Sequence, residues 1–259
     1  MERLDVFLVQ NNFFSSRNKA QNEIKNGNIE VNGKVVRKTG YQVDEESKIK
    51  IVGSPLKYVS KGGLKLEKAI YEFHLDLRNK IMLDIGSSTG GFCDCALQHN
   101  IAYIYAVDVG KDQFTSSLLE SKKISLYENT DIRDFDFNKK NISFVTIDVS
   151  FISVLKFLKV LKEVFSIKEV VCLIKPQFEC GKMVADQYKG VVLDKKVHEE
   201  VIKRVVQGFS DIGFSLSSLT FSPIQGGSGN IEYLGYFTRK NKEKEVSYRK
   251  VVENAFSSF

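Results

Sequence analysis

The stretch Met82–Phe92, MLDIGSSTGGF, decides the fold. Its apolar opening is typical of a buried strand, and a glycine-rich turn follows at once. Gly86, Gly90 and Gly91 do not have the G-x-G-x-x-G spacing of dinucleotide-binding enzymes. Glycines let the backbone of such a turn approach a ligand closely because they carry no Cβ atom. We expect a strand, a ligand-binding turn and the start of a helix, although a plain strand-to-helix turn also favours glycine.

Apolar segments of strand length alternate with helical segments on both sides of this stretch. The predicted strands cover 80–86, 102–109, 125–130, 143–150, 170–175, 218–224 and 232–238. The predicted helices cover 63–75, 93–99, 111–121, 153–165, 195–209 and 241–256. Alternation of this kind, with nearly continuous apolar strands, indicates a doubly wound, Rossmann-like α/β sheet of seven strands.

The first 52 residues have the pattern of a small, separate α+β unit. Leu4, Phe7 and Leu8 lie on one helical face, and a second short helix starts after two serines and ends at Gly27. Asn32-Gly33 is a turn signal between two strand-like segments. Gly53-Ser54-Pro55 then interrupts the pattern. We therefore assign residues 1–52 to a small N-terminal domain, 53–60 to a linker and 61–259 to the α/β domain.

The net charge of +6 is distributed unevenly. Residues 1–68 carry +5 and residues 239–259 carry +3, whereas residues 69–238 carry −2. Basic ends around a nearly neutral body suggest that the chain binds a polyanion, although solubilising surface charge would give the same count. The basic residues of the first unit that could contact RNA phosphates are Arg17, Lys19, Lys25, Lys34, Arg37 and Lys38.

Several functional classes do not fit the composition. The N-terminus lacks the apolar core of a signal peptide, and no apolar run approaches membrane-spanning length, so we expect a cytoplasmic protein. The 4 cysteines show no C-x-x-C spacing and there are only 3 histidines, so we expect no metal site and no disulfide.

Three acidic residues follow successive predicted strands at the edge where an open α/β sheet binds its ligand. Asp84 ends the first strand, Asp108 ends the second where a ribose diol would lie, and Asp131 follows the third where an adenine amino group could be met. Carboxylates suit S-adenosylmethionine, which carries a sulfonium and an amino group, better than NAD with its anionic pyrophosphate. We expect Asp84 to face this ligand crevice.

Lys175 ends a strongly apolar strand and is followed by Pro176. Asp148 ends the preceding strand, Lys65 lies on the helix that opens the domain, and Glu232 starts the last strand. Two lysines and two carboxylates that converge on one cleft would be unusual in a core, because unpaired buried charge is strongly unfavourable. A single lysine whose side chain reaches solvent at the end of a strand would not need such partners.

The segments SKGGLKL, DIGSSTGGF, DVSFIS, LIKPQFE and GNIE together resemble the TlyA family of ribosomal RNA 2′-O-methyltransferases. The resemblance covers almost the whole chain. It implies a class I methyltransferase domain similar to the FtsJ type, preceded by an S4-type RNA-binding domain. It also implies a catalytic tetrad of Lys65, Asp148, Lys175 and Glu232. Two departures are Lys61, where arginine is more usual, and Cys93, where a small hydroxyl residue is frequent.

The resemblance also implies the other site residues. S-adenosyl-L-methionine would contact Asp84, Gly86, Ser88, Gly90, Gly91, Phe92, Asp108 and Asp131. Ribosomal RNA would contact Lys61 together with the basic residues of the first unit. The reaction is transfer of a methyl group to a cytidine 2′-oxygen, which is a poor nucleophile until a base removes its proton. We assign Lys175 as the base and Lys65 as the residue that positions the 2′-hydroxyl, with Asp148 and Glu232 orienting both lysines.

The acceptor within the family is a cytidine in the large-subunit RNA, the small-subunit RNA or both. We favour the large-subunit 23S RNA because the short ends of this chain resemble the shorter branch of the family, and we expect a monomer. One alternative is a membrane-active haemolysin, a name that family members have carried; the lack of a strongly apolar segment argues against it. Another is an RNA-binding module without catalysis, which the intact tetrad opposes.

Overall fold

The computed structural model describes residues 1–14, 16–52, 56–239 and 245–259. Its contacts divide the chain into two units, Met1–Pro55 and Leu56–Phe259. Residues 53–55 of the predicted linker lie outside the described residues. The prediction that the linker extends to residue 60 is wrong, because residues 56–60 belong to the second unit, where the Tyr58 ring is buried in the core.

The described residues of the first unit form two helices and short strands. Its elements are β1 (Glu2–Arg3), α1 (Leu4–Gln10), α2 (Arg17–Asn26), β2 (Ile29–Val31), β3 (Lys34–Val35), β4 (Gln42–Val43) and β5 (Ile49–Ile51). Ser16 caps α2 by accepting a hydrogen bond from the Lys19 amide, and Gly27 ends it with φ of 77°. Asn32 and Gly33, both with positive φ, turn β2 into β3.

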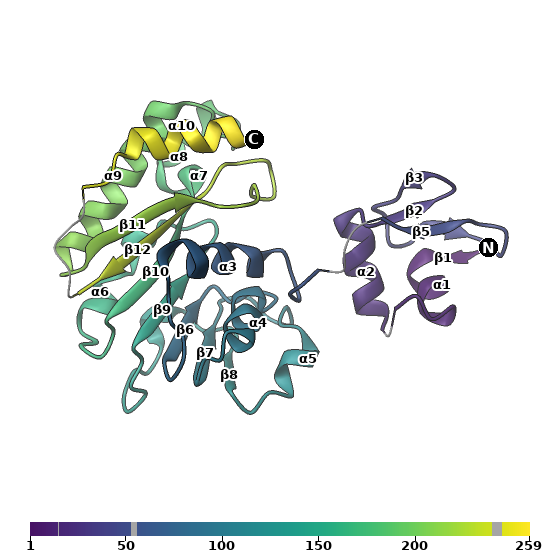
Figure 1. The fold of residues 1–259 in the computed structure, drawn as a ribbon, viewed down its shortest axis with the longest axis horizontal. Helices are drawn as coiled ribbons and strands as arrows, with labels where there is room; N and C mark the ends of the chain where they lie inside the picture. The colour runs from purple at the N-terminus through teal and green to yellow at the C-terminus, as the bar shows by residue number, and fades with distance from the viewer. Residues whose placement is uncertain (15, 53–55, 240–244) are drawn as a thin grey trace. The chain divides into compact units, whose positions relative to one another are not determined.

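The second unit contains a sheet in which the described residues form seven strands, in the order β11-β12-β10-β9-β6-β7-β8 (Figure 1). The strands are β6 (Ile81–Ile85), β7 (Tyr103–Val107), β8 (Ile124–Tyr127), β9 (Phe144–Ile147), β10 (Glu169–Ile174), β11 (Ser215–Phe221) and β12 (Tyr233–Thr238). The five neighbouring strands β10, β9, β6, β7 and β8 are parallel, whereas β12 runs antiparallel to both of its neighbours. The predicted α/β fold is confirmed.

Helices cover both faces of this sheet. They are α3 (Gly62–Phe73), α4 (Gly91–Gln98), α5 (Ser116–Leu119), α6 (Leu158–Lys162), α7 (Pro176–Glu179), α8 (Lys182–Gln187), α9 (Lys195–Asp211) and α10 (Tyr248–Ser258), with 3-10 turns η1 (Ile132–Asp134) and η2 (Val154–Lys156). The segment 111–121, predicted as one helix, forms only the short α5. Residues 241–244 of the predicted terminal helix lie outside the described residues.

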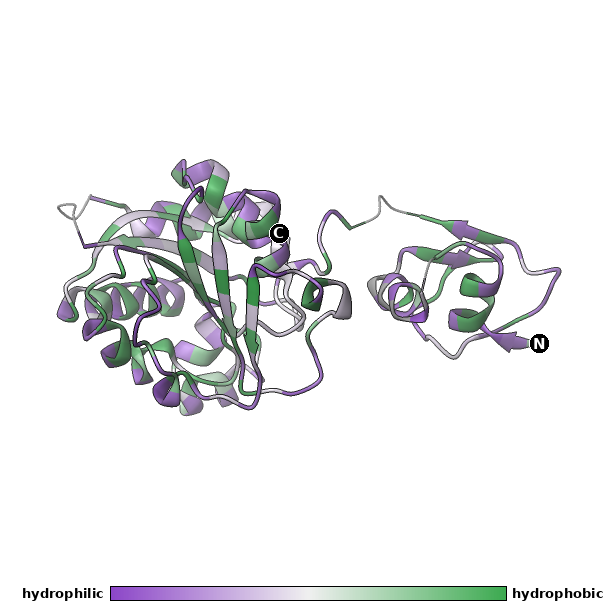
Figure 2. Ribbon diagram, turned by 90° about the horizontal axis from the view of Figure 1, so that it is seen from below, coloured by the Kyte–Doolittle hydropathy of each residue, from purple (hydrophilic) through white to green (hydrophobic). Residues whose placement is uncertain are grey.

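The alternation of side chains along the strands separates the core into two layers, one on each face of the sheet. Hydrophobic residues recur along the strands and the helices beside them (Figure 2). Along β10, Val170 and Cys172 pack on the side covered by α6, α9 and α10. Val171 and Leu173 pack on the other side, beneath α3 and α4. Because β6 and β9 are neighbours whose following segments leave in opposite directions along the sheet, a crevice opens beyond their carboxyl ends.

Candidate active site

Two cavities lie at this edge of the sheet. The larger cavity, about 540 Å³, is lined by residues of the α3 start, the β10 end and the segment before β12. The smaller cavity, about 400 Å³, is lined by residues that follow β6, β7, β8 and β9. The residues that line both are Gly86, Ser88, Asp148, Ser150 and Phe151. The two cavities therefore meet where β6 and β9 end.

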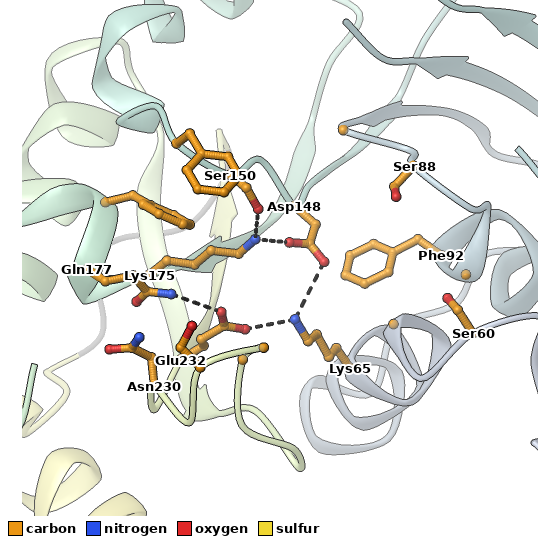
Figure 3. Close-up of a pocket in the computed structure, with 18 of the residues that line it drawn as sticks. Ser60, Lys65, Ser88, Phe92, Asp148, Ser150, Lys175, Gln177, Asn230 and Glu232 are labelled. Atoms are coloured by element: carbon orange, nitrogen blue, oxygen red, sulfur yellow. Dashed lines mark hydrogen bonds and ion pairs between the residues drawn. The ribbon is translucent and has the colours of Figure 1, made fainter. Parts of the chain in front are cut away.

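Four charged side chains form one network in the larger cavity (Figure 3). Lys65 Nζ lies 2.7 Å from Glu232 Oε2 and 3.7 Å from Asp148 Oδ2. The other oxygen of that aspartate, Oδ1, lies 2.6 Å from Lys175 Nζ. Asp148 thus bridges the two lysines with its two oxygens. All four residues that the sequence singled out as a tetrad are brought together.

Strand register explains why residues so distant in sequence meet. Ile174 pairs with Tyr233, so Lys175 and Glu232 extend from neighbouring strands at the same edge. Close packing against glycines also fixes the positions of Asp148 and Glu232. A Cβ atom on Gly86 would lie 2.5 Å from the backbone oxygen of Asp148, and one on Gly226 would lie 2.6 Å from Glu232 Oε1. The backbone of Asp148 and the carboxylate of Glu232 are therefore each packed against a glycine.

Burial and charge together determine the electrostatics of the network. Lys65 is 8% exposed, Lys175 is 6% exposed and Glu232 is 2% exposed, each value for the whole residue. Burial lowers the pKa of Lys65, but the negative charges of Asp148 and Glu232 outweigh burial, so the pKa is raised above its usual value. Lys65 is consequently held as an ammonium ion.

The smaller cavity contains the two later aspartates. Asp108 accepts hydrogen bonds from the backbone N–H groups of Ser88 at 2.7 Å and Gly110 at 2.6 Å, which ties it to the glycine-rich turn. Asp131 accepts hydrogen bonds from the Arg133 side chain and backbone, and these lower the pKa of Asp131 to about 2. Both carboxylates line the cavity and are available as acceptors for a ligand.

Asp84 is placed differently from the expectation. It is 1% exposed and accepts hydrogen bonds from Thr146 Oγ1 at 2.6 Å and Cys93 Sγ at 3.1 Å. It shares the face of β6 on which Met82 lies, and α4 covers that face. The prediction that Asp84 faces the ligand crevice is therefore wrong. Burial raises its pKa to about 6, although the hydrogen bonds from Thr146 and Cys93 oppose the shift.

The other predicted contact residues of the turn lie around the start of α4. Gly91 and Phe92 line the larger cavity. Gly90 instead ends the turn with φ of 89°, and a Cβ atom there would lie 2.5 Å from the Leu118 side chain. Lys61 is exposed beside the cavity-lining Ser60 and Gly62.

The predicted RNA-binding residues of the first unit differ in their surroundings. Lys19, Lys25, Lys34, Arg37 and Lys38 are exposed. Arg17 is also exposed, but its Nε donates to Asp5 Oδ2 at 2.8 Å. Asp5 is fully buried and also accepts hydrogen bonds from Arg3 and Gln21. Arg17 is therefore part of an ion-pair cluster that joins α1 to α2.

Sequence reasoning missed several residues of the larger cavity. Ser150 accepts a hydrogen bond from Lys175 Nζ at 3.0 Å, and Gln177 Nε2 donates to Glu232 Oε1 at 3.3 Å. Phe151 is 91% exposed and has φ of 65°. Figure 3 shows Gln177 and Asn230 on one side of the network, with Ser88 and Phe92 on the other. Ser150, Phe151 and Gln177 lie close in sequence to Asp148 or Lys175, and this closeness is the only signal that could have identified them.

The turn after β6 has the features of a ligand cradle. The two buried side-chain atoms without a hydrogen-bond partner among the described residues are Ser87 Oγ and Gln177 Oε1, and both residues line the larger cavity. Buried polar atoms of this kind usually have a partner, so a ligand that supplies one fits the site. The described residues include no group of three or more His, Cys, Asp or Glu side chains placed to hold a metal ion.

Comparison with known proteins agrees with this geometry. Residues 58–239 match the FtsJ-like methyltransferase family and residues 2–49 match the S4 domain. A candidate rRNA methyltransferase of Bacillus subtilis, YqxC, is 44% identical over 90% of this chain and 84% of its own. The 23S rRNA (cytidine-2′-O)-methyltransferase TlyA of Campylobacter jejuni is 34% identical over 90% of this chain and 98% of its own.

A solved structure, of a candidate hemolysin from Streptococcus thermophilus, has 38% sequence identity and a TM-score of 0.78. The likeness covers 99% of this chain and 96% of that one. The relatives and the two matching domains extend over nearly the same residues as the motifs quoted above. The chain belongs to the FtsJ-like methyltransferases and, within them, to the TlyA family.

Proposed function

We propose that this protein methylates the 2′-oxygen of a cytidine ribose in ribosomal RNA, with S-adenosylmethionine as methyl donor and 23S RNA as the favoured acceptor. The observation that carries the proposal is the network of Lys65, Asp148, Lys175 and Glu232 in the larger cavity, in which Asp148 also lines the smaller cavity. The relative from Campylobacter jejuni, named for this reaction on 23S rRNA, supports the choice of acceptor.

The two lysines have different roles in this proposal. The pKa of Lys65 is raised, because its two carboxylate partners outweigh its burial, so Lys65 stays protonated and donates a hydrogen bond to the acceptor oxygen. Lys175 is then the base. The 2′-hydroxyl proton moves to Lys175 Nζ while the oxygen electron pair forms the bond to the methyl carbon, and the carbon–sulfur bond breaks with its pair left on sulfur. Asp148 fixes the spacing of both amines.

The smaller cavity is the proposed cofactor site. Asp108 would accept hydrogen bonds from a ribose diol and Asp131 from an adenine amino group, while the turn from Gly86 to Ser88 passes beside the reacting end. S-adenosylmethionine, when bound, supplies an activated methyl group. The protein residues therefore contribute mainly position and charge, which are fixed before the substrate arrives. Asp84 lines neither cavity, and in this proposal it supports the turn through its hydrogen bonds with Thr146 and Cys93.

The first unit supplies the proposed contact with RNA. Its exposed basic side chains lie in the residues that match the S4 domain, and phosphate contacts by such side chains bind RNA with little reading of bases. We propose ribosomal RNA or a ribosomal subunit as the partner, a monomeric enzyme, and a cytoplasmic site of action where ribosomes are assembled.

The test is methyl transfer by the purified protein from radiolabelled S-adenosylmethionine to 16S and 23S RNA, as free RNA and within subunits. A 2′-O-methyl group blocks alkaline cleavage of the following phosphodiester, so the modified position is found as a gap in the hydrolysis ladder. We expect one or more gaps at cytidines. Label in the RNA without a gap would mean that a base is methylated, and would contradict the proposal.

The hemolysin name of the neighbour from Streptococcus thermophilus motivates a second assay. Among the described residues, none of the helices has the length and apolar character needed to cross a bilayer. We expect no release of dye from liposomes exposed to the purified protein. Release in the absence of RNA and S-adenosylmethionine would favour the membrane-active alternative.

A further inference from the structure

The amine of Lys175 has two hydrogen-bond acceptors among the described residues. Asp148 Oδ1 lies 2.6 Å from Nζ, and Ser150 Oγ lies 3.0 Å from it. The centre of the Phe178 ring lies 5.8 Å from Nζ. One of the four tetrahedral positions of the nitrogen is taken by the side-chain carbon, and these two acceptors occupy two more. A single position is left in the larger cavity.

The number of occupied positions around the nitrogen matters because a lysine that acts as a base needs a free lone pair. A neutral amine carries two N–H bonds and one lone pair. If Asp148 and Ser150 accept the two N–H bonds, the lone pair occupies the remaining position, where a substrate hydroxyl can reach it. With Asp148 alone as acceptor, the amine can rotate about its Cε–Nζ bond, and the lone pair points toward the hydroxyl only part of the time.

The fold places both acceptors with one short segment. Asp148 and Ser150 follow β9 two residues apart, and both line the two cavities at their junction. Lys175 follows β10 and reaches this segment from the neighbouring strand. Gly86 packs against the backbone of Asp148, which fixes the start of the segment. The position of the serine hydroxyl is thus set by the sheet edge that also sets the carboxylate.

We infer that Ser150 is a positioning residue: its hydroxyl oxygen accepts the second N–H of Lys175 and so directs the lone pair of the amine at the acceptor 2′-hydroxyl. The inference rests on the proposed function, because it specifies how the base of that reaction is oriented. It assigns a role to the serine of the DVSF segment beyond the four charged residues.

Kinetics of Ser150→Ala provide the first test. We expect kcat to fall about 10- to 100-fold, as for loss of one well-placed contact in a catalytic site, while KM for RNA and the affinity for S-adenosylhomocysteine change less than about twofold. Ser150→Thr keeps the hydroxyl and should restore most of kcat. The matched control is Ser210→Ala, which removes an exposed serine hydroxyl from α9 and should leave kcat unchanged. Unchanged kcat in Ser150→Ala, or equal losses in the alanine and threonine variants, would overturn the inference.

A second measurement needs neither cofactor nor RNA. NMR of protein with ¹³C-labelled lysine reports the order of each Cε group, and Lys175→Arg identifies the signal of Lys175. We expect the Lys175 signal to be well ordered in the wild type, more mobile in Ser150→Ala and ordered again in Ser150→Thr. Equal order in all three proteins would overturn the inference even if methyl transfer is observed. Absence of transfer by the wild type would instead reject the proposed function, and the NMR result would still decide whether Ser150 holds the amine.

Discussion

The two units of this protein hold their charged side chains in opposite ways. In the methyltransferase unit, Lys65 and Lys175 are buried and each is paired with a carboxylate at a defined distance. In the S4 unit, the basic side chains are exposed, and Arg17 is tied to a buried carboxylate. Buried pairs cannot be rearranged without leaving a charge unpaired, whereas exposed lysines adapt to many phosphate positions. The first arrangement suits catalysis and the second suits binding.

The largest effect is expected from Lys175→Arg. Arginine can keep the contact with Asp148 but stays protonated, so it is unable to act as a base. We predict a fall in kcat of about 10³-fold, with the affinity for S-adenosylhomocysteine within about twofold by calorimetry. Lys162→Ala, an exposed lysine on α6, is the control and should behave as the wild type. Near-normal turnover by Lys175→Arg would contradict the assignment of Lys175 as the base.

Asp84 tests burial of charge without a partner of opposite sign. Its folded-state pKa is raised to about 6, above an ordinary value of about 4 in the unfolded chain. Between these values the folded protein binds more protons than the unfolded chain, so this group makes the unfolding free energy decrease as pH rises. The expected decrease is about 3 kcal/mol. It is measured as the stability difference between the wild type and Asp84→Asn from pH 4 to 7; a difference independent of pH would contradict the raised pKa.

Asp108→Ala separates cofactor binding from catalysis. Loss of hydrogen bonds to a charged group lowers affinity by about 10- to 100-fold, so we predict that much weaker binding of S-adenosylhomocysteine in calorimetry. Asp112→Ala removes a nearby, exposed aspartate and should bind normally. If both variants bind as the wild type does, the smaller cavity is not the cofactor site.

The smallest effects are expected in the S4 unit. Lys19→Ala should weaken RNA binding a few-fold and reduce the slope of log affinity against log salt by about 1, with no change in melting temperature. Arg17→Ala should also lower the melting temperature, because it breaks the contact with Asp5 that joins α1 to α2. Identical melting temperatures of the two variants would mean that Arg17 contributes no more to the stability of the fold than Lys19 does.

The sequence motifs predicted the fold and the convergence of the four tetrad residues because most of them mark one edge of the sheet. Asp148 and Lys175 follow parallel strands that end at this edge, and Glu232 precedes the antiparallel β12, which starts there. Lys65 lies instead near the start of α3. The motifs did not predict on which face of β6 the Asp84 side chain lies. Position within a motif does not determine exposure, because alternation along the strand turns this carboxylate beneath α4. The extent of the linker is likewise not set by local sequence, since burial of Tyr58 depends on contacts with distant residues.

Apart from their closeness in sequence to Asp148 and Lys175, nothing in the sequence marks Ser150 and Gln177, because their partners are set by the distance between strand ends. Ser150 meets Lys175 from 25 positions away, and Gln177 meets Glu232 from 55 positions away. Neither contact produces a local pattern. The involvement of Arg17 with Asp5 was likewise hidden, because a basic residue in a short helix has the same pattern whether it is free or paired.

The most direct test of the central claim maps 2′-O-methyl groups on 16S and 23S RNA incubated with S-adenosylmethionine and either the wild-type protein or Lys175→Arg. We predict new 2′-O-methylcytidine in the RNA treated with the wild type, and none above background in the RNA treated with the variant. Equal methylation by both proteins would contradict the account, as would a methyl group attached to a base instead of a ribose.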